Sequence, residues 1–206
     1  MIRLLTIILL LTNIAHAEEG IIKEPLKYDV EIIIFEDANA RYLNSEYWPQ
    51  NAIIDVTKNS KAKLHLSKTN KALYKNIKPQ ILSKEYRRMK NSKDYNVLFF
   101  GSWRQTGLEA KKAFSINIEA LTNNHKGTSK NRLTGNLRLV LARYLHIYSE
   151  LDYQRHTATE VATETTTQNA PLHISNHRRM RSKELHYIDH PLLGMLIQIN
   201  PVKPAQ

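Results

Sequence analysis

The chain has 206 residues, with 30 Lys and Arg against 19 Asp and Glu, and it has no cysteine. The absence of cysteine excludes disulfide frameworks, thiolate catalysis, cysteine-ligated zinc and iron–sulfur clusters. With 42% hydrophobic residues and only 6 Gly and 7 Pro, the composition excludes low-complexity and collagen-like chains. The length suits one domain, or at most two small ones.

The first seventeen residues have the pattern of a secretory signal peptide. A basic Arg3 precedes the apolar run 4–11, and Ala15-His16-Ala17 is a small-x-small cleavage site before two glutamates. The apolar run is shorter than the roughly 20 residues that a membrane-spanning helix needs. We therefore expect cleavage after Ala17 and an exported, soluble protein in which residues 18–206 form a single domain.

Export changes how the charge is interpreted. A formal net charge of +11 would indicate nucleic acid as a partner in a cytoplasmic protein. An exported basic protein instead meets acidic envelope material, such as lipid headgroups, lipopolysaccharide or the carboxylates of peptidoglycan stem peptides. Plain solubility is an equally good explanation of the charge.

The first half of the chain predicts strands and one helix. Residues 28–35 carry apolar side chains on both faces, which is typical of a central strand. The aromatic landmark Tyr47-Trp48-Pro49 lies in an irregular stretch, before short extended segments at 52–56 and 63–66. Residues 79–90 predict a helix that starts at a proline and has one apolar face, formed by Leu82, Tyr86 and Met89.

Further strands are expected at 95–103 and 114–118. The clearest periodicity runs from Leu133 to Leu151, where leucine or isoleucine occupies most odd positions. This period of two predicts a long half-buried strand, bent near Gly135. Arg143 interrupts the apolar face, so it needs either a partner or a bulge. Our hypothesis for the partner is a buried bridge with an acid, either Glu184 or Asp189.

The last quarter begins with a threonine-rich segment at 156–170 that predicts a flexible loop. Residues 172–188 predict a strand with a basic middle, followed by a turn or a helix start at 189–191, a last strand at 193–199 and a tail at 201–206. The expected fold class is α+β, a mainly antiparallel β-sheet with one or two helices packed on a face. The alternative is an all-β sandwich with a decorating helix.

Neither a metal site nor a catalytic motif is expected. His186 and His190, four residues apart around Asp189, could share zinc on a helix, but Pro191 and a strand end indicate a structural turn. The chain has no G-x-S-x-G elbow and no glycine-rich phosphate loop. Nothing selects Glu150 or Glu184 as a glycosidase acid, so a periplasmic hydrolase is the weaker alternative and no cofactor is expected.

Basic and aromatic residues form the predicted binding surface. Tyr144, His146 and Tyr148 share one face of the long strand with Arg138, and a paired 172–188 strand would place arginines beside these rings. Guanidinium groups bind carboxylates through two hydrogen bonds, and rings pack on the apolar faces of sugars. The candidate residues are Arg138, Tyr144, His146, Tyr148, Arg178, Arg179, Arg181 and His186. The alternative is an ordinary solvated face with cross-strand pairs.

Several segments carry a family resemblance. They include the opening strand 28–35 with Glu46-Tyr47-Trp48-Pro49, the strand that ends in Trp103-Arg104-Gln105, and Arg143-Tyr144-Leu145-His146. The most specific is Arg178-Arg179-Met180-Arg181-Ser182 followed by Glu184-Leu185-His186-Tyr187-Ile188-Asp189-His190-Pro191-Leu192-Leu193-Gly194. In these segments the chain resembles the CsiV family, named for cell-shape integrity and described as peptidoglycan-binding proteins of the Gram-negative periplasm.

The resemblance implies a periplasmic location, no enzymatic activity and support of cell-wall synthesis. It also implies a partnership with a class A penicillin-binding protein and its outer-membrane lipoprotein activator. The motif residues are expected to be structural: Trp48, Trp103, Gln105, Arg143, Glu184, Tyr187, Asp189, His190 and Pro191. A protein-interaction module that reaches the wall only through such a partner is the main alternative, and a membrane-surface or lipopolysaccharide binder is a further one.

Overall fold

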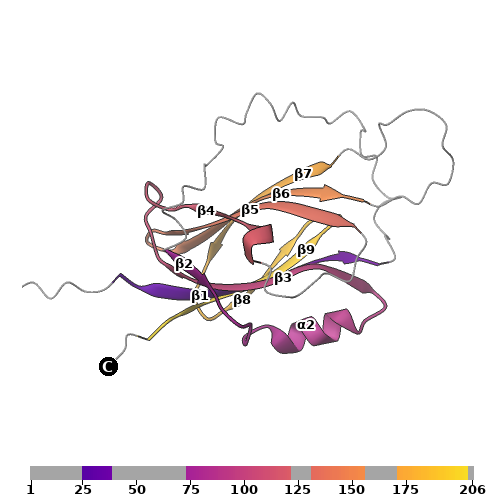
Figure 1. The fold of residues 1–206 in the computed structure, drawn as a ribbon, viewed down its shortest axis with the longest axis horizontal. Helices are drawn as coiled ribbons and strands as arrows, with labels where there is room; N and C mark the ends of the chain where they lie inside the picture. Colours follow the sequence, from indigo (N-terminus) through magenta and orange to yellow (C-terminus); the bar gives the residue numbers. More distant parts are fainter. Residues whose placement is uncertain (1–24, 39–72, 122–130, 156–170, 204–206) are drawn as a thin grey trace, which may run out of the picture.

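The computed structural model describes residues 25–38, 73–121, 131–155 and 171–203, which are coloured in Figure 1. The predicted signal peptide, Trp48 with the extended segments at 52–56 and 63–66, and the threonine-rich segment 156–170 lie outside the described residues. Within the described part of the chain, no helix has the length and apolar character needed to cross a bilayer.

The described strands form two sheets, and each pairing between neighbours is antiparallel. The five-stranded sheet has the order β2 (Tyr74–Asn76), β3 (Tyr95–Thr106), β1 (Lys27–Asp37), β9 (Gly194–Pro201), β8 (Leu185–Asp189). The four-stranded sheet has the order β4 (Ser115–Asn117), β5 (Arg132–Leu141), β6 (Leu145–Gln154), β7 (Leu172–Met180). Helix α2 (Ser83–Lys90) and the short 3-10 helix η3 (Ile118–Leu121) complete the described elements.

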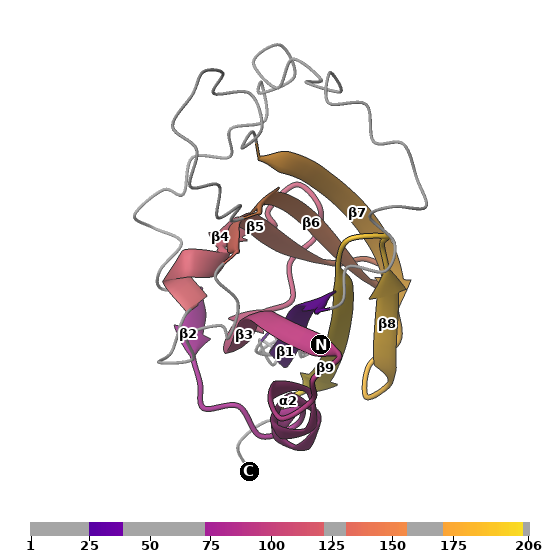
Figure 2. The ribbon, with the colours of Figure 1, turned by 90° about the vertical axis from the view of Figure 1, so that its right-hand side faces the viewer.

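The two sheets pack face to face, and α2 covers the other face of the five-stranded sheet (Figure 2). The larger core lies between the sheets and takes alternate residues of β1, namely Val30, Ile32 and Ile34, which are fully buried. The intervening residues Ile33 and Phe35 face the smaller core under α2. Strand β1 is therefore buried on both faces, which confirms the predicted central strand.

The expected class, α+β with a mainly antiparallel sheet, is confirmed. The packing of two sheets against each other was a feature of the alternative prediction, the all-β sandwich. The apolar face predicted for the helix is correct, because Leu82, Tyr86 and Met89 are all buried. The ring of Tyr86 stacks on Phe100 of β3, with 4.4 Å between the ring centroids.

Helix α2 begins later than predicted, at Ser83 rather than Pro79. The cause lies in β1, where the buried Glu31 accepts hydrogen bonds from the backbone N–H groups of Gln80, Ile81 and Leu82 at 2.6, 2.9 and 2.8 Å. These contacts hold the segment before the helix in an irregular path, and they satisfy N–H groups that lack partners at a helix start.

The long strand predicted from Leu133 to Leu151 is wrong, because this segment is a hairpin of β5 and β6. The turn comprises residues 142–144, and Leu141 pairs with Leu145 across it. Paired residues in a hairpin lie on the same face, and these two are four positions apart. The apolar parity therefore continues through the turn, so periodicity alone could not reveal it.

The single strand predicted at 172–188 is also wrong. It consists of β7, which pairs with β6, and β8, which pairs with β9 in the other sheet. The chain changes sheets between them at Lys183, which has a φ of 68° and whose N–H donates to the carbonyl of Ile199 at 2.8 Å. The strand predicted at 114–118 is shorter, because Ile118 already belongs to η3. Strand β2 was not predicted.

Candidate functional site

The outer face of the four-stranded sheet presents an aligned set of polar and aromatic side chains. Every second residue of β6 points outward, because the residues between them are buried. Each of these outward residues lies opposite an outward residue of β7. The cross-strand pairs are His146 with Arg179, Tyr148 with His177, Glu150 with Ser175, and Asp152 with His173. We call this outer surface the polar face.

One end of the polar face is built from flat rings. The Tyr148 ring lies on the His177 ring, with 4.2 Å between centroids and 7° between planes. His177 Nε2 is hydrogen-bonded to His146 Nδ1 at 2.9 Å, so one imidazole donates and the other accepts. We call Tyr144, His146, Tyr148, His177 and Arg179 the aromatic end.

Arg179 extends this end over the β5–β6 turn. Its guanidinium carbon lies 4.7 Å from the centroid of the Tyr144 ring, within the range of a cation–π contact. Tyr144 is 38% exposed, so it offers ring surface to solvent. A guanidinium placed among aromatic rings can bind a carboxylate while the rings pack on an apolar surface such as a sugar face.

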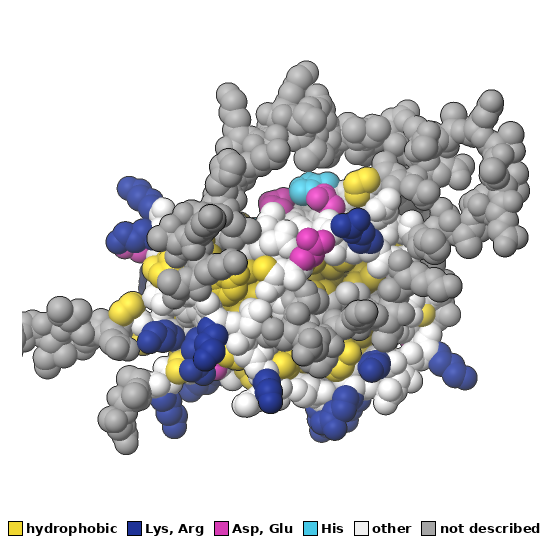
Figure 3. Space-filling model, viewed as in Figure 1, with side chains coloured by type: hydrophobic (Ala, Val, Ile, Leu, Met, Phe, Trp, Pro, Cys, Tyr) yellow, Lys and Arg dark blue, Asp and Glu magenta, His cyan; other side chains and the backbone are white. Residues whose placement is uncertain are grey.

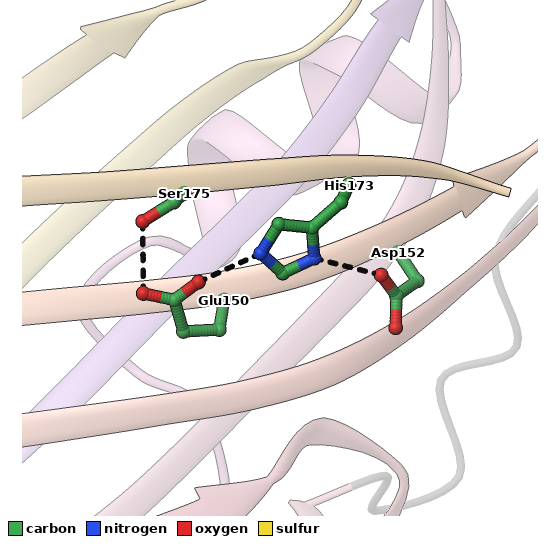
Figure 4. A network of polar contacts seen from close by, with 4 residues as sticks. All are labelled: Glu150, Asp152, His173 and Ser175. Carbon is green, nitrogen blue, oxygen red and sulfur yellow. Dashed lines mark hydrogen bonds and ion pairs between the residues drawn. The ribbon is translucent and has the colours of Figure 1, made fainter. Parts of the chain in front are cut away.

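The other end of the polar face is a charged network, drawn in Figure 4. His173 Nδ1 is 2.9 Å from Asp152 Oδ1, and its Nε2 is 2.9 Å from Glu150 Oε2. The Ser175 hydroxyl donates to Glu150 Oε1 at 2.8 Å. Because both ring nitrogens contact carboxylate oxygens, both must donate, and this arrangement requires the imidazolium form of His173.

The electrostatics agree with this protonation. Partial burial lowers the pKa of His173, but its hydrogen bonds with Asp152 and Glu150 raise the pKa more, to above the usual 6.5. The side chains of His173, Glu150 and Asp152 are 36%, 53% and 46% exposed, so solvent screens the network. The network joins β7, an edge strand, to β6.

The charge distribution differs from the expected row of arginines. In the view of Figure 3, most of the visible Lys and Arg side chains lie over the half of the molecule that contains α2 and β1. The upper part of the view, where β6 and β7 lie, instead shows histidine beside acidic side chains. The polar face is therefore mixed in charge, with Arg179 at one end and two carboxylates toward the other.

Five of the eight predicted binding residues come together. Arg138, His146, Tyr148 and Arg179 lie on the polar face, with Tyr144 in the adjoining turn. The side chain of Arg138 is held in place because its Nη2 donates to the carbonyl oxygen of Ala110.

The other three predicted residues lie elsewhere. Arg178 is next to Arg179 in β7, so its side chain points to the opposite face of the strand, where it is exposed. Arg181 lies after β7, with its Nη1 3.8 Å from Glu184 Oε1. His186 Nε2 accepts the backbone N–H of Arg181 at 3.2 Å, which holds the turn between the two sheets. The prediction had placed these residues beside the aromatic rings by assuming that one strand, 172–188, pairs with the strand of Tyr144, His146 and Tyr148.

Arg143 does not form the expected buried bridge. It is exposed in the β5–β6 turn, and its guanidinium carbon lies 5.8 Å from the Tyr144 ring centroid. Glu184 contacts Arg181 instead, and Asp189 Oδ1 accepts the Tyr187 hydroxyl at 2.8 Å. The expectation failed because Arg143 is in a turn and not on the apolar face of a strand.

Trp103 and Gln105 form a buried pair on β3. They are two positions apart on β3, so they share a face of the strand, and the indole N–H donates to Gln105 Oε1 at 2.7 Å. Both side chains are buried, at 0% and 2% exposure. Trp103 therefore packs in the core, as expected, and its polar N–H group is satisfied there.

The segment Asp189-His190-Pro191 leads into a turn and not a helix, and the turn begins at His190 because Asp189 is the last residue of β8. It joins β8 to β9, and the backbone groups of His190 and Leu193 exchange two hydrogen bonds of 3.0 and 3.1 Å. His190 Nδ1 also accepts the N–H of Leu192 at 3.2 Å.

Across the described ranges, no group of three or more His, Asp or Glu side chains is arranged to hold a metal ion.

Sequence reasoning missed part of the polar face. His173, Ser175, His177 and Asp152 were not among its candidates, and Glu150 was weighed only as a hydrolase acid. The feature that could have identified them is the alternation of outward and inward side chains along β7, combined with its register against β6.

Comparison with curated proteins gives no match, and comparison with solved structures gives none. The family model described as "Peptidoglycan-binding protein, CsiV" matches residues 1–202. This match spans the strands of both sheets, the polar face and the turn after β8. The chain therefore belongs to the CsiV family of peptidoglycan-binding proteins.

Proposed function

We propose that this protein is exported to the periplasm, as a single domain from residue 18 onward, and binds peptidoglycan through the aromatic end of the polar face. The observation that supports this most is Arg179 stacked on Tyr144 beside the layered rings of Tyr148 and His177. The guanidinium would bind a stem-peptide carboxylate and the rings would pack on the glycan. The family's description as peptidoglycan-binding supports the ligand class.

The proposed role is adsorption and not catalysis. Ser175, His173 and Asp152 have the residue types of a nucleophilic triad but not its connections. The Ser175 hydroxyl donates to Glu150, and both nitrogens of His173 already contact carboxylates, so no imidazole nitrogen is available to take the serine proton. This arrangement favours a binding protein over a hydrolase.

We further propose that binding serves cell-wall synthesis and cell-shape integrity, together with a class A penicillin-binding protein and its outer-membrane lipoprotein activator. The basis for these partners is the resemblance of the sequence to the CsiV family. A protein that reaches the wall only through such a partner would ignore purified sacculi. Binding to sacculi free of protein therefore separates the two possibilities.

The test is co-sedimentation of the exported protein with protein-free sacculi over a salt series. Arg179→Ala is the test variant and Arg178→Ala is the matched control, since the two neighbours carry the same charge on opposite faces of β7. We expect Arg179→Ala to weaken binding about 5- to 10-fold, equivalent to about 1 to 1.4 kcal/mol, and Arg178→Ala to change it less than twofold.

Salt should weaken binding of the unmodified protein, because exposed charges are screened over about 8 Å at physiological ionic strength. Equal losses in the two variants would indicate attraction by net charge and contradict a site on the polar face. No sedimentation at any salt concentration would contradict direct binding and favour capture through a partner. Release of soluble fragments from the sacculi would contradict the non-enzymatic role.

A further inference from the structure

A groove lies away from the polar face, where β8 turns into β9. It has a volume of about 160 Å³ and is lined by the ends of β1, β3 and β8 and by the turn. Three aromatic rings form its wall: Phe35 is buried, with Tyr95 edge-on at 5.2 Å and Tyr187 stacked at 6.3 Å between centroids. Tyr95 and Tyr187 are 39% and 50% exposed, so both rings present surface to a ligand.

The groove is acidic in a strongly basic protein. Among the residues that the structure describes, its lining includes the carboxylates of Asp37 and Asp189 but no lysine or arginine. The Tyr187 hydroxyl donates to Asp189 Oδ1 at 2.8 Å, which holds this carboxylate at the edge of the aromatic wall. His190 Nδ1 accepts the Leu192 N–H at 3.2 Å, which fixes the ring against the turn.

We propose that this groove binds a primary ammonium group on an alkyl chain, specifically the free amino end of the diamino acid in an uncrosslinked stem peptide. Aromatic faces attract cations through the ring quadrupole, and two carboxylates add direct charge attraction. The inference rests on the proposed peptidoglycan function and adds the ammonium group, a part of the ligand that the Arg179 guanidinium would repel.

The size of the groove limits what it can accept. A cavity of roughly 150 Å³ holds a ring the size of benzene. A groove of about 160 Å³ therefore has room for the end of one side chain, whereas a disaccharide would extend beyond it. The polar face and the groove would then bind different parts of the wall, one taking carboxylate and sugar and the other taking the ammonium.

The first test uses the exported protein and two sacculus preparations, one untreated and one with its free amines acetylated. Acetylation makes the polymer more negative, so attraction to a basic protein by net charge predicts stronger sedimentation. The groove predicts the opposite, a severalfold loss. Asp189→Asn should remove the difference between the preparations, and the control Glu109→Gln should keep it, since Glu109 is an exposed acid beside Lys112.

The second test does not depend on sacculi. The probe is the soluble tripeptide alanyl-glutamyl-diaminopimelate with an acetylated N-terminus, titrated with its side-chain amine either free or acetylated. We expect the free-amine probe to shift the NMR signals of the Tyr95 and Tyr187 rings and to bind Asp189→Asn at least fivefold more weakly. Equal response to both probes, or none to either, would overturn the proposal. Failure with sacculi but selective binding of the free-amine tripeptide would overturn only the function proposed for the polar face.

Discussion

The buried carboxylate of Glu31, in the middle of β1, accepts the backbone N–H of Leu82 at 2.8 Å, 51 residues along the chain where α2 begins. The same carboxylate accepts two more N–H groups, from Gln80 and Ile81. A strand side chain thus provides the cap that the helix lacks, since Leu82 offers no side-chain acceptor at the N-cap position. This contact ties α2 to the sheet that carries one wall of the main core.

Replacing Glu31 should therefore destabilise the fold. Glu31→Ala leaves three N–H groups without a partner, and we expect a loss of about 2–4 kcal/mol in the free energy of unfolding. Glu31→Gln keeps one acceptor oxygen and should lose less. Urea unfolding monitored by circular dichroism measures both. A Glu31→Ala protein as stable as the unmodified one would show that the cap is dispensable.

A second buried contact joins the two sheets. The Tyr153 hydroxyl on β6 donates to Glu36 Oε2 on β1 at 2.7 Å and accepts from Asn131 at 3.0 Å. Burial raises the pKa of Tyr153 well above its usual 10, and the hydrogen bond to Glu36 raises it further. Tyr153 is therefore held in its neutral form in the folded protein.

Tyr153→Phe should lower the free energy of unfolding by about 1–2 kcal/mol at pH 7. Because the folded-state pKa lies above the unfolded one, this contribution is complete below pH 10 and decreases as the pH rises beyond 10. The difference between the two proteins should thus shrink above about pH 10. Denaturation curves collected at several pH values test it, and a difference that grows with alkali would contradict the assigned contact.

His173 gives a pH dependence near neutrality. Its folded-state pKa is raised above 6.5, because the bonds to Asp152 and Glu150 outweigh the effect of burial. The stabilisation is thus complete below about pH 6.5 and is lost as the pH rises through the folded-state value. The melting temperature of His173→Gln should fall furthest below that of the unmodified protein at pH 5.5–6.

The matched control for this variant is His186→Gln, because His186 lies outside the network. An NMR titration of the His173 ring checks the same contact directly, with an expected midpoint above 6.5. A melting-temperature difference that does not change between pH 5.5 and 8.5 would contradict the charged form of His173.

Much of the fold could be predicted because apolar periodicity reports burial directly. The central strand β1 and the buried face of α2 follow from the spacing of their apolar residues. The connections between strands were harder to predict, because the apolar residues keep to odd positions on both sides of the turn between Leu141 and Leu145. The switch of sheets at Lys183 depends on a positive φ, which no glycine or asparagine marks at that position.

The candidate site was predicted in part for the same reason. His146 and Tyr148 followed from the strand phase, whereas the assignment of Arg178 and Arg181 assumed one continuous strand. The register of β7 against β6 brings His173 to Asp152, and register depends on the whole sheet. A long basic run was thus the less informative feature, because its arginines point in different directions.

Replacing Gln105 should lower the stability of the fold without changing its binding to peptidoglycan. Its side chain satisfies the buried indole N–H of Trp103, so Gln105→Leu should destabilise the fold by about 1–3 kcal/mol. Below its melting temperature the variant should still bind sacculi with unchanged affinity, because both residues are buried in the core. Thermal unfolding and co-sedimentation measure these two effects, and weaker binding by a fully folded variant would contradict a purely structural role.

The central claim is that the polar face contacts peptidoglycan. The most direct measurement is an NMR titration of the isotopically labelled protein, residues 18–206, with soluble glycan–peptide fragments released from sacculi. We predict the largest chemical-shift changes in Tyr144, His146, Tyr148, His177 and Arg179. Shift changes confined to the basic half around α2, with the aromatic end unaffected, would contradict the account.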